Sequence, residues 1–128
     1  MSAHKRIMVI DDDQDFISYV HIVLEAGGYE VDTALSVADG LRKMRENPPD
    51  LVITDVMLSR VLNGWTIHHE IKSDPNLAHI PILMVSAIVS VQDGDLFPTV
   101  ENGQADAFMS KPIEPAALLQ RVAELVQE

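Results

Sequence analysis

Short apolar runs that stop at a polar or acidic residue constrain the possible fold of this chain more than any other sequence feature. Uninterrupted runs of this length are typical of strands buried on both faces, as in a parallel sheet covered by helices. The sequence therefore favours an α/β fold. The three clearest runs are residues 7–10, which stop at Asp11, residues 51–54, which stop at Asp55, and residues 80–85, which stop at Ser86.

Apolar residues at helical spacing separate these runs. Between residues 16 and 24 they recur on one helix face, and Gly27 with Gly28 predicts the end of that helix. Ser36 followed by Asp39 has the pattern of a helix N-cap with an acidic third residue. Pro115 suits the first turn of a last helix over 115–126.

Strand and helix patterns alternate five times, with further strands expected at 29–34 and 107–109. Such alternation requires right-handed crossovers and a parallel sheet with helices on both faces. We expect a doubly wound, five-stranded (βα)5 sandwich of three layers. A chain of 128 residues fits one domain, residues 1–128. Between 87 and 103 the pattern is poor, and Gly94 and Pro98 predict a short or irregular helix there.

Composition excludes several classes of protein. The 9 basic and 20 acidic residues give a net charge of −11, which repels phosphate backbones, so we expect no direct binding to nucleic acid. The absence of cysteine excludes disulfides and thiolate chemistry. Neither a membrane-spanning run nor a signal peptide is evident, and we expect a cytoplasmic domain.

Polar groups at the ends of the expected strands form the candidate site. Carboxyl ends of parallel strands share one edge, where ligands bind. Three aspartates close together repel one another, and Mg²⁺, which prefers carboxylate and phosphate oxygens, relieves that repulsion. A lysine and a hydroxyl nearby suit phosphoryl transfer, with one carboxylate as nucleophile. The residues are Asp11, Asp12, Asp55, Ser86 and Lys111.

These motifs, taken in order, resemble the receiver domain of two-component response regulators, the CheY-like branch of the flavodoxin-like folds. The resemblance covers essentially the whole chain. We therefore expect a single receiver domain with no output domain in this chain, either as a stand-alone regulator or as a fragment of a longer protein. The pieces that carry it are residues 9–12, 51–55, Asn63-Gly64, 81–87 and 105–112.

The resemblance implies a role for each site residue. Asp55 would accept the phosphoryl group, and Lys111 and Ser86 would contact it. Phe108 would be an aromatic switch that turns inward as Ser86 moves. Mg²⁺ would be held by Asp11, Asp12, Asp55 and the backbone carbonyl of Met57. Asp13 would instead begin the following helix, where an acid suits the helix dipole.

The resemblance also implies partners. A sensor histidine kinase or phosphotransfer protein would supply the phosphoryl group, and an output target that the sequence does not name would receive the signal. The domain would catalyse only its own phosphorylation and dephosphorylation, as a monomer or a phosphorylation-dependent homodimer.

Two other functions remain open at this point. The first is a pseudo-receiver, a constitutive interaction module with the fold but not the chemistry. The second is a flavodoxin-like cofactor binder, which the acidic strand ends disfavour because they repel a flavin phosphate. A phosphatase of the Asp-x-Asp type does not fit, because the second residue after Asp55 is Met57.

Overall fold

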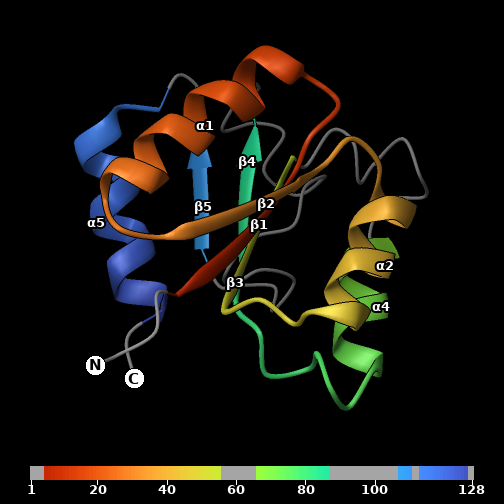
Figure 1. Ribbon diagram of the computed structural model, residues 1–128. Coiled ribbons are helices and arrows are strands. Elements are labelled where there is room, and N and C mark those ends of the chain that lie inside the picture. Colours follow the sequence, from red (N-terminus) through yellow and green to blue (C-terminus); the bar gives the residue numbers. More distant parts are fainter. Residues whose placement is uncertain (1–4, 56–65, 87–106, 111–112, 127–128) are drawn as a thin grey trace, which may run out of the picture.

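The computed structural model describes residues 5–55, 66–86, 107–110 and 113–126. Strands and helices alternate in the described residues up to residue 86, as the sequence predicts, and a fifth strand and a last helix follow further along the chain (Figure 1). The strands are β1 (Arg6–Ile10), β2 (Glu30–Ala34), β3 (Leu51–Asp55), β4 (Ile82–Ser86) and β5 (Ala107–Ser110). The helices are α1 (Gln14–Ala26), α2 (Val37–Glu46), α4 (Thr66–Ser73) and α5 (Pro115–Val126). The expected irregular helix within 87–103 lies outside the described residues.

All pairings in the sheet are parallel, and the strand order is β2-β1-β3-β4-β5. This order reverses direction at the first strand, between β1 and β3, which is the doubly wound arrangement in which ligands bind at the carboxyl ends of the strands. The predicted α/β fold with five parallel strands is therefore confirmed.

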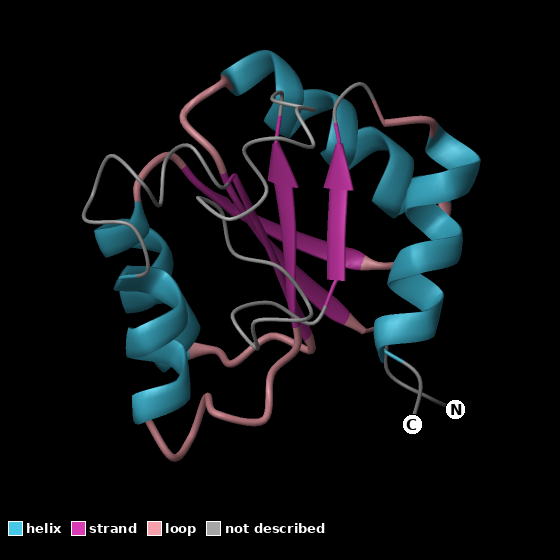
Figure 2. Ribbon diagram, turned by 180° about the vertical axis from the view of Figure 1, so that it is seen from behind, coloured by secondary structure: helices cyan, strands magenta, loops and turns pink. Residues whose placement is uncertain are grey.

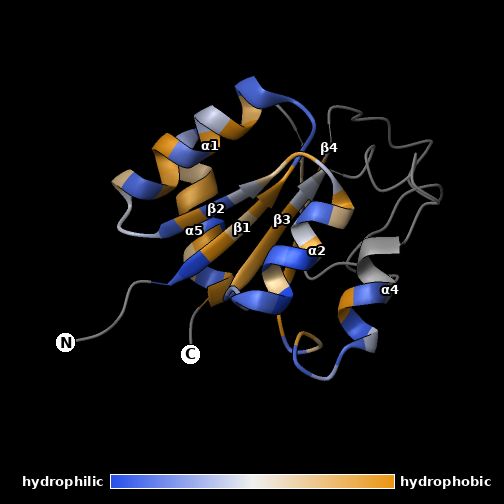
Figure 3. Cartoon of the chain, turned by 45° about the vertical axis from the view of Figure 1, so that its right-hand side comes forward, coloured by the Kyte–Doolittle hydropathy of each residue, from blue (hydrophilic) through white to orange (hydrophobic). Residues whose placement is uncertain are grey.

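Helices cover both faces of the sheet (Figures 1 and 2). The helices α1 and α5 lie on one face, and α2 and α4 lie on the other. Each face has its own apolar cluster, because alternate strand residues point to opposite sides. Ile7, Val9 and Ile53 belong to the cluster under α1 and α5, and Met8 and Val52 belong to the cluster under α2 and α4. Figure 3 shows the apolar strands between helices whose outer faces are polar.

Local signals fix both ends of α1. Asp13 is the N-cap, and its side chain accepts hydrogen bonds from the backbone amides of Asp15 and Phe16. At the other end Gly28 has a φ of 94°, a conformation that favours glycine. The amide of Tyr29 bonds to the carbonyl of Leu24 over 3.1 Å, which closes the helix. The predicted helix start at Asp13 and the stop at the glycine pair are confirmed.

The strand over 80–85 was predicted to begin two residues too early. The Ile80 amide donates to the carbonyl of Leu77 over 3.0 Å, in a turn, and Pro81 has no amide hydrogen to give to a neighbouring strand. Regular pairing therefore begins at Ile82. At the other end, Asp55 and Ser86 are the last residues of β3 and β4 rather than residues beyond them.

In the part of the chain that the structure describes, no helix has both the length and the apolar character needed to cross a membrane.

Candidate functional site

Backbone pairing brings the expected site residues to one edge of the sheet. Ile10 pairs with Thr54, so Asp11 and Asp55 each come one residue later on adjacent strands. Asp55 itself pairs with Val85, the residue before Ser86. Ser86 pairs with Ser110, after which the chain continues to Lys111. Because neighbouring strands lie about 4.8 Å apart, these positions form a row across four strands.

Asp11 is buried at this edge of the sheet, with 1% of its surface exposed. Its backbone amide donates to the carbonyl of Ala34 over 3.1 Å, which holds the end of β1 against the end of β2. Its Oδ1 accepts the amide hydrogen of Asp13 over 2.9 Å. A carboxylate that also binds its own backbone is held in place before any ligand arrives.

The next two aspartates have different environments. Asp12 is exposed, and it lies in the turn between the end of β1 and the N-cap of α1. Asp13 is also exposed, and its Oδ1 accepts from the amides of Asp15 and Phe16 over 3.0 Å and 3.3 Å. Since Asp13 already serves as a helix cap, the structure separates it from the pair that the sequence assigns to the metal.

For three other predicted residues the structure describes the backbone only. Asp55 and Ser86 end β3 and β4, and Phe108 pairs with Met84 in β5. Met57 and Lys111 lie outside the described residues. The structure therefore fixes where the chain carries Asp55, Ser86 and Phe108, and the roles of all five residues stay predictions.

The residues expected to hold a metal have a suitable chemistry for Mg²⁺. Aspartate and backbone carbonyl oxygens are hard donors, which this ion prefers, and two of the predicted ligands are consecutive residues at the end of β1. Among side chains in the described segments, no three acidic or histidine residues are gathered into a metal cluster. The predicted third acidic ligand, Asp55, is outside that set, because only its backbone is described.

Sequence reasoning missed Thr54, which lies directly before Asp55. Its side chain is fully buried, and its neighbours in the sheet are Ile10 and Met84 of the apolar cluster under α2 and α4. Among buried side chains of the described residues, the Thr54 hydroxyl lacks a hydrogen-bond partner. The sequence did offer a signal for this buried hydroxyl, because Thr54 is a polar residue within the otherwise apolar run 51–54.

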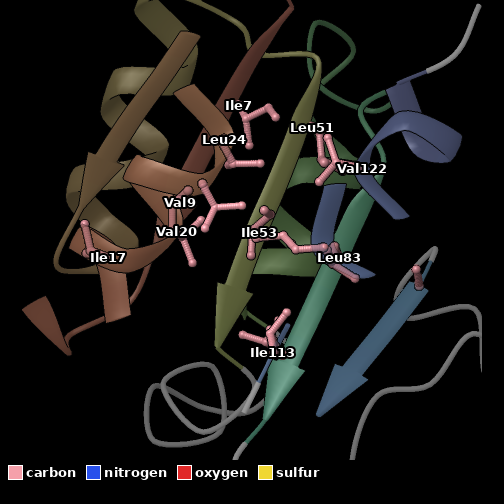
Figure 4. Close-up of a cluster of buried hydrophobic side chains, with 14 residues drawn as sticks. Ile7, Val9, Ile17, Val20, Leu24, Leu51, Ile53, Leu83, Ile113 and Val122 are labelled. Carbon is pink, nitrogen blue, oxygen red and sulfur yellow. The ribbon is translucent and has the colours of Figure 1, made fainter. Parts of the chain in front are cut away.

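Sequence reasoning also missed a contact beside the position of Lys111. The hydroxyl of Tyr19, on α1, donates to the backbone carbonyl of Ile113 over 2.5 Å. Ile113 is 6% exposed and belongs to the cluster under α1 and α5. Figure 4 places Ile113 at the carboxyl end of β3 and β4, beyond Ile53 and Leu83. No local pattern predicts a bond between residues 94 positions apart.

Comparison with known protein families gives a match over most of the chain. The model of the response regulator receiver domain matches residues 7–123. The response regulator PleD of Caulobacter vibrioides is 34% identical over 127 residues, which are 99% of this chain and 27% of PleD. The DNA-binding dual master transcriptional regulator RpaA of Synechocystis is also 34% identical, over 95% of this chain and 49% of RpaA. This chain therefore spans about a quarter of the length of PleD and about half of the length of RpaA.

A third relative has nearly the same length as this chain. The polar-differentiation response regulator DivK of Brucella ovis is 29% identical over 118 residues, which are 92% of this chain and 93% of DivK. The family therefore includes proteins made of little more than this domain and proteins in which it is one part.

Solved structures support the fold. The CheY-like receiver domain protein of Methanospirillum hungatei superimposes with a TM-score of 0.81 and 27% identity, over 97% of this chain and 94% of that one. A receiver domain protein of Clostridium thermocellum gives a TM-score of 0.79 and 28% identity, over 95% and 94% of the two chains.

Proposed function

The chain belongs to the response regulator receiver domain family, and we propose that it is a phosphorylation switch that accepts a phosphoryl group on Asp55. The observation that carries the proposal is the row of Asp11, Asp55 and Ser86 along one sheet edge, which the strand register fixes. Asp55 and Ser86 come 44 and 75 positions after Asp11 in the sequence. They reach the same row only because their strands are parallel and adjacent.

Mg²⁺ would be held by Asp11, Asp12, Asp55 and the backbone carbonyl of Met57. The ion would supply positive charge for the oxygens of the transferring phosphoryl group, as metal ions do in phosphoryl transfer generally. Asp11 suits a role in orienting this site, because its burial and its bond to the Asp13 amide leave it little freedom.

In the proposed reaction a carboxylate oxygen of Asp55 forms a bond to phosphorus as the bond between phosphorus and a histidine nitrogen of the donor breaks. The imidazole keeps the electron pair of that bond. Lys111 would place its ammonium beside the phosphoryl oxygens. Attack by water on the acyl phosphate would later release inorganic phosphate and restore the Asp55 carboxylate, so the domain would catalyse only its own phosphorylation and dephosphorylation.

The signal would leave the site through β4 and β5. Ser86 would bond to a phosphoryl oxygen, and Phe108 would turn inward as Ser86 moves. These two strands are adjacent, with Met84 opposite Phe108 and Ser86 opposite Ser110, which supports a coupled movement of the two residues.

The proposed donor is a sensor histidine kinase or a phosphotransfer protein, in the cytoplasm, and the output would be a partner protein or a further domain. RpaA, a longer protein, is a DNA-binding regulator, whereas the net charge of −11 on this chain opposes binding to a phosphate backbone. A monomer that dimerises on phosphorylation fits the proposal.

Mass spectrometry after incubation with acetyl phosphate and Mg²⁺ tests the function. We expect the intact protein to gain one phosphoryl group, and we expect Asp55→Asn or removal of Mg²⁺ by a chelator to prevent the gain. Asp50→Asn is the matched control, because Asp50 lies just before the amino end of the same strand, where its Oδ2 accepts from the Arg6 amide over 2.8 Å.

Two results would contradict the proposal. A protein that gains no phosphoryl group would be a pseudo-receiver, the constitutive interaction module that is the alternative function. A gain that survives Asp55→Asn would place the acceptor elsewhere.

A further inference from the structure

We propose that Tyr19 is a positioning residue for Lys111, an inference that rests on the proposed function. The hydroxyl of Tyr19 donates to the carbonyl of Ile113, two residues beyond Lys111, over 2.5 Å. Through this bond α1 holds the chain that follows the phosphate-binding lysine.

Ile113 is attached to the rest of the protein through its side chain and through its backbone. Its side chain is buried with Ile53, Leu83 and other residues of the cluster under α1 and α5, and Figure 4 shows it at the end of the sheet where the site residues lie. The Tyr19 bond adds a second attachment, through the backbone. An amide carbonyl at such a buried position needs a partner, because it has given up its hydrogen bonds to water.

The residue before Lys111 in the chain is also held in place. Ser110 ends β5, where it pairs with Ser86 of β4. Only Lys111 and Pro112 separate Ser110 from Ile113, and a residue spans at most about 3.6 Å. Proline also restricts its own φ. Attachments at Ser110 and Ile113 therefore limit how far the chain between them can reach from the end of the sheet.

Helix α1 joins this attachment to the acidic end of the site. Tyr19 lies six residues after the N-cap Asp13, or about 9 Å along the helix at 1.5 Å per residue. Asp13 in turn bonds to Asp11. One rigid helix therefore connects the acidic residues expected to bind Mg²⁺ with the segment expected to bind the phosphoryl oxygens, and Tyr19 makes the second of these connections.

Tyr19→Phe tests the proposal, since it removes only the hydroxyl. Beryllofluoride serves as the phosphoryl analogue and is titrated at saturating Mg²⁺, and Mg²⁺ affinity is measured separately. We expect the affinity for beryllofluoride to fall about three- to tenfold, the equivalent of one hydrogen bond, with Mg²⁺ affinity unchanged. Lys111→Ala should give the same pattern with a larger loss.

The matched control is Tyr29→Phe. Tyr29 is the other of the two tyrosines in the chain and packs against the same apolar cluster, but it lies after the carboxyl end of α1. We expect this variant to bind both ligands like the wild type.

The remaining outcomes overturn the inference. If Tyr19→Phe leaves both affinities unchanged, lowers both, or lowers only that for Mg²⁺, the hydroxyl does not act through Lys111. If the wild-type protein binds no beryllofluoride, both the proposed function and the role of Tyr19 are wrong. If the wild type binds beryllofluoride and Tyr19→Phe binds it with the same affinity, only the inference about Tyr19 is wrong.

Discussion

The carboxylate of Asp11 accepts a hydrogen bond from the backbone amide of Asp13, with 2.9 Å between Oδ1 and the nitrogen. Asp13 then uses its own carboxylate to cap α1. Three consecutive aspartates thus divide into a buried residue that shapes the turn, an exposed residue, Asp12, and a helix cap. This division predicts which of the three can be replaced without loss of Mg²⁺.

Replacing Asp13 should affect stability and leave Mg²⁺ binding intact. Asp13→Ala removes the acceptor for the amides of Asp15 and Phe16, and loss of an N-cap costs about 1 kcal/mol. Asp13→Ser keeps a capping oxygen and should restore most of that stability. Chemical denaturation measures the free energy of unfolding, and calorimetric titration measures the Mg²⁺ affinity.

Asp12→Asn is the comparison for this experiment. It should weaken Mg²⁺ binding with little change in stability, since Asp12 is exposed. Loss of Mg²⁺ affinity in Asp13→Ser, with normal affinity in Asp12→Asn, would show that the metal pair is misassigned.

Thr54→Val should leave the protein as stable as the wild type or make it more stable. The Thr54 side chain is buried on a strand whose paired residues are Ile10 and Met84. Its hydroxyl has no hydrogen-bond partner among the described residues, and valine has nearly the same shape. Replacing such a hydroxyl by a methyl group removes its desolvation penalty, which is about 1–3 kcal/mol. Thermal unfolding measures the effect, and Thr54→Ser, which keeps the hydroxyl and loses the methyl group, should be less stable. A clear destabilisation by valine would mean that the hydroxyl binds a buried water.

Gly40→Ala should destabilise the protein although alanine favours helices. A Cβ at position 40 of α2 would lie 2.8 Å from Cγ1 of Ile10 and closer still to its Cδ1. Overpacking of this kind costs about 1–3 kcal/mol, against a helix propensity gain of about 1 kcal/mol. The double variant Gly40→Ala with Ile10→Val, which removes Cδ1, should lose less stability than the two single variants predict. Denaturant unfolding measures these losses. If the loss of unfolding free energy in the double variant equals the sum of the losses in the two single variants, the close contact is contradicted.

Acid should remove a contribution of Asp39 to stability. The hydrogen bond from the Arg42 side chain holds the pKa of Asp39 below its ordinary value, with a further contribution from Lys43 that burial opposes. A carboxyl with a lowered folded pKa stabilises the fold above its unfolded pKa, and this stabilisation disappears as the pH falls through the folded value.

Asp39→Asn should therefore reduce the melting temperature slightly near neutral pH. The difference should begin to shrink below about pH 4 and disappear in stronger acid. The effect should be small and weaken with salt, because the pair is exposed. A difference of constant size from neutral pH to strong acid would mean that the loss comes from helix propensity rather than from charge.

Much of this molecule follows from local signals in the sequence. The apolar runs predicted buried strands, and Asp13, Ser36 and the pair Gly27-Gly28 predicted helix ends that the structure confirms. These features need no distant partner, because caps and turns act within a few residues. The parallel sheet followed from the alternation of strand and helix, which leaves few topologies.

Tertiary structure alone decided the finer relationships. Only the strand register shows that Asp11 and Asp55 follow paired residues, and only the packing of α1 shows that Tyr19 reaches Ile113. The hydroxyl of Thr54 and the crowding at Gly40 also depend on residues from other strands and helices. A sequence pattern records what each segment prefers by itself, whereas these contacts join segments whose separation along the chain has no relation to their distance in the fold.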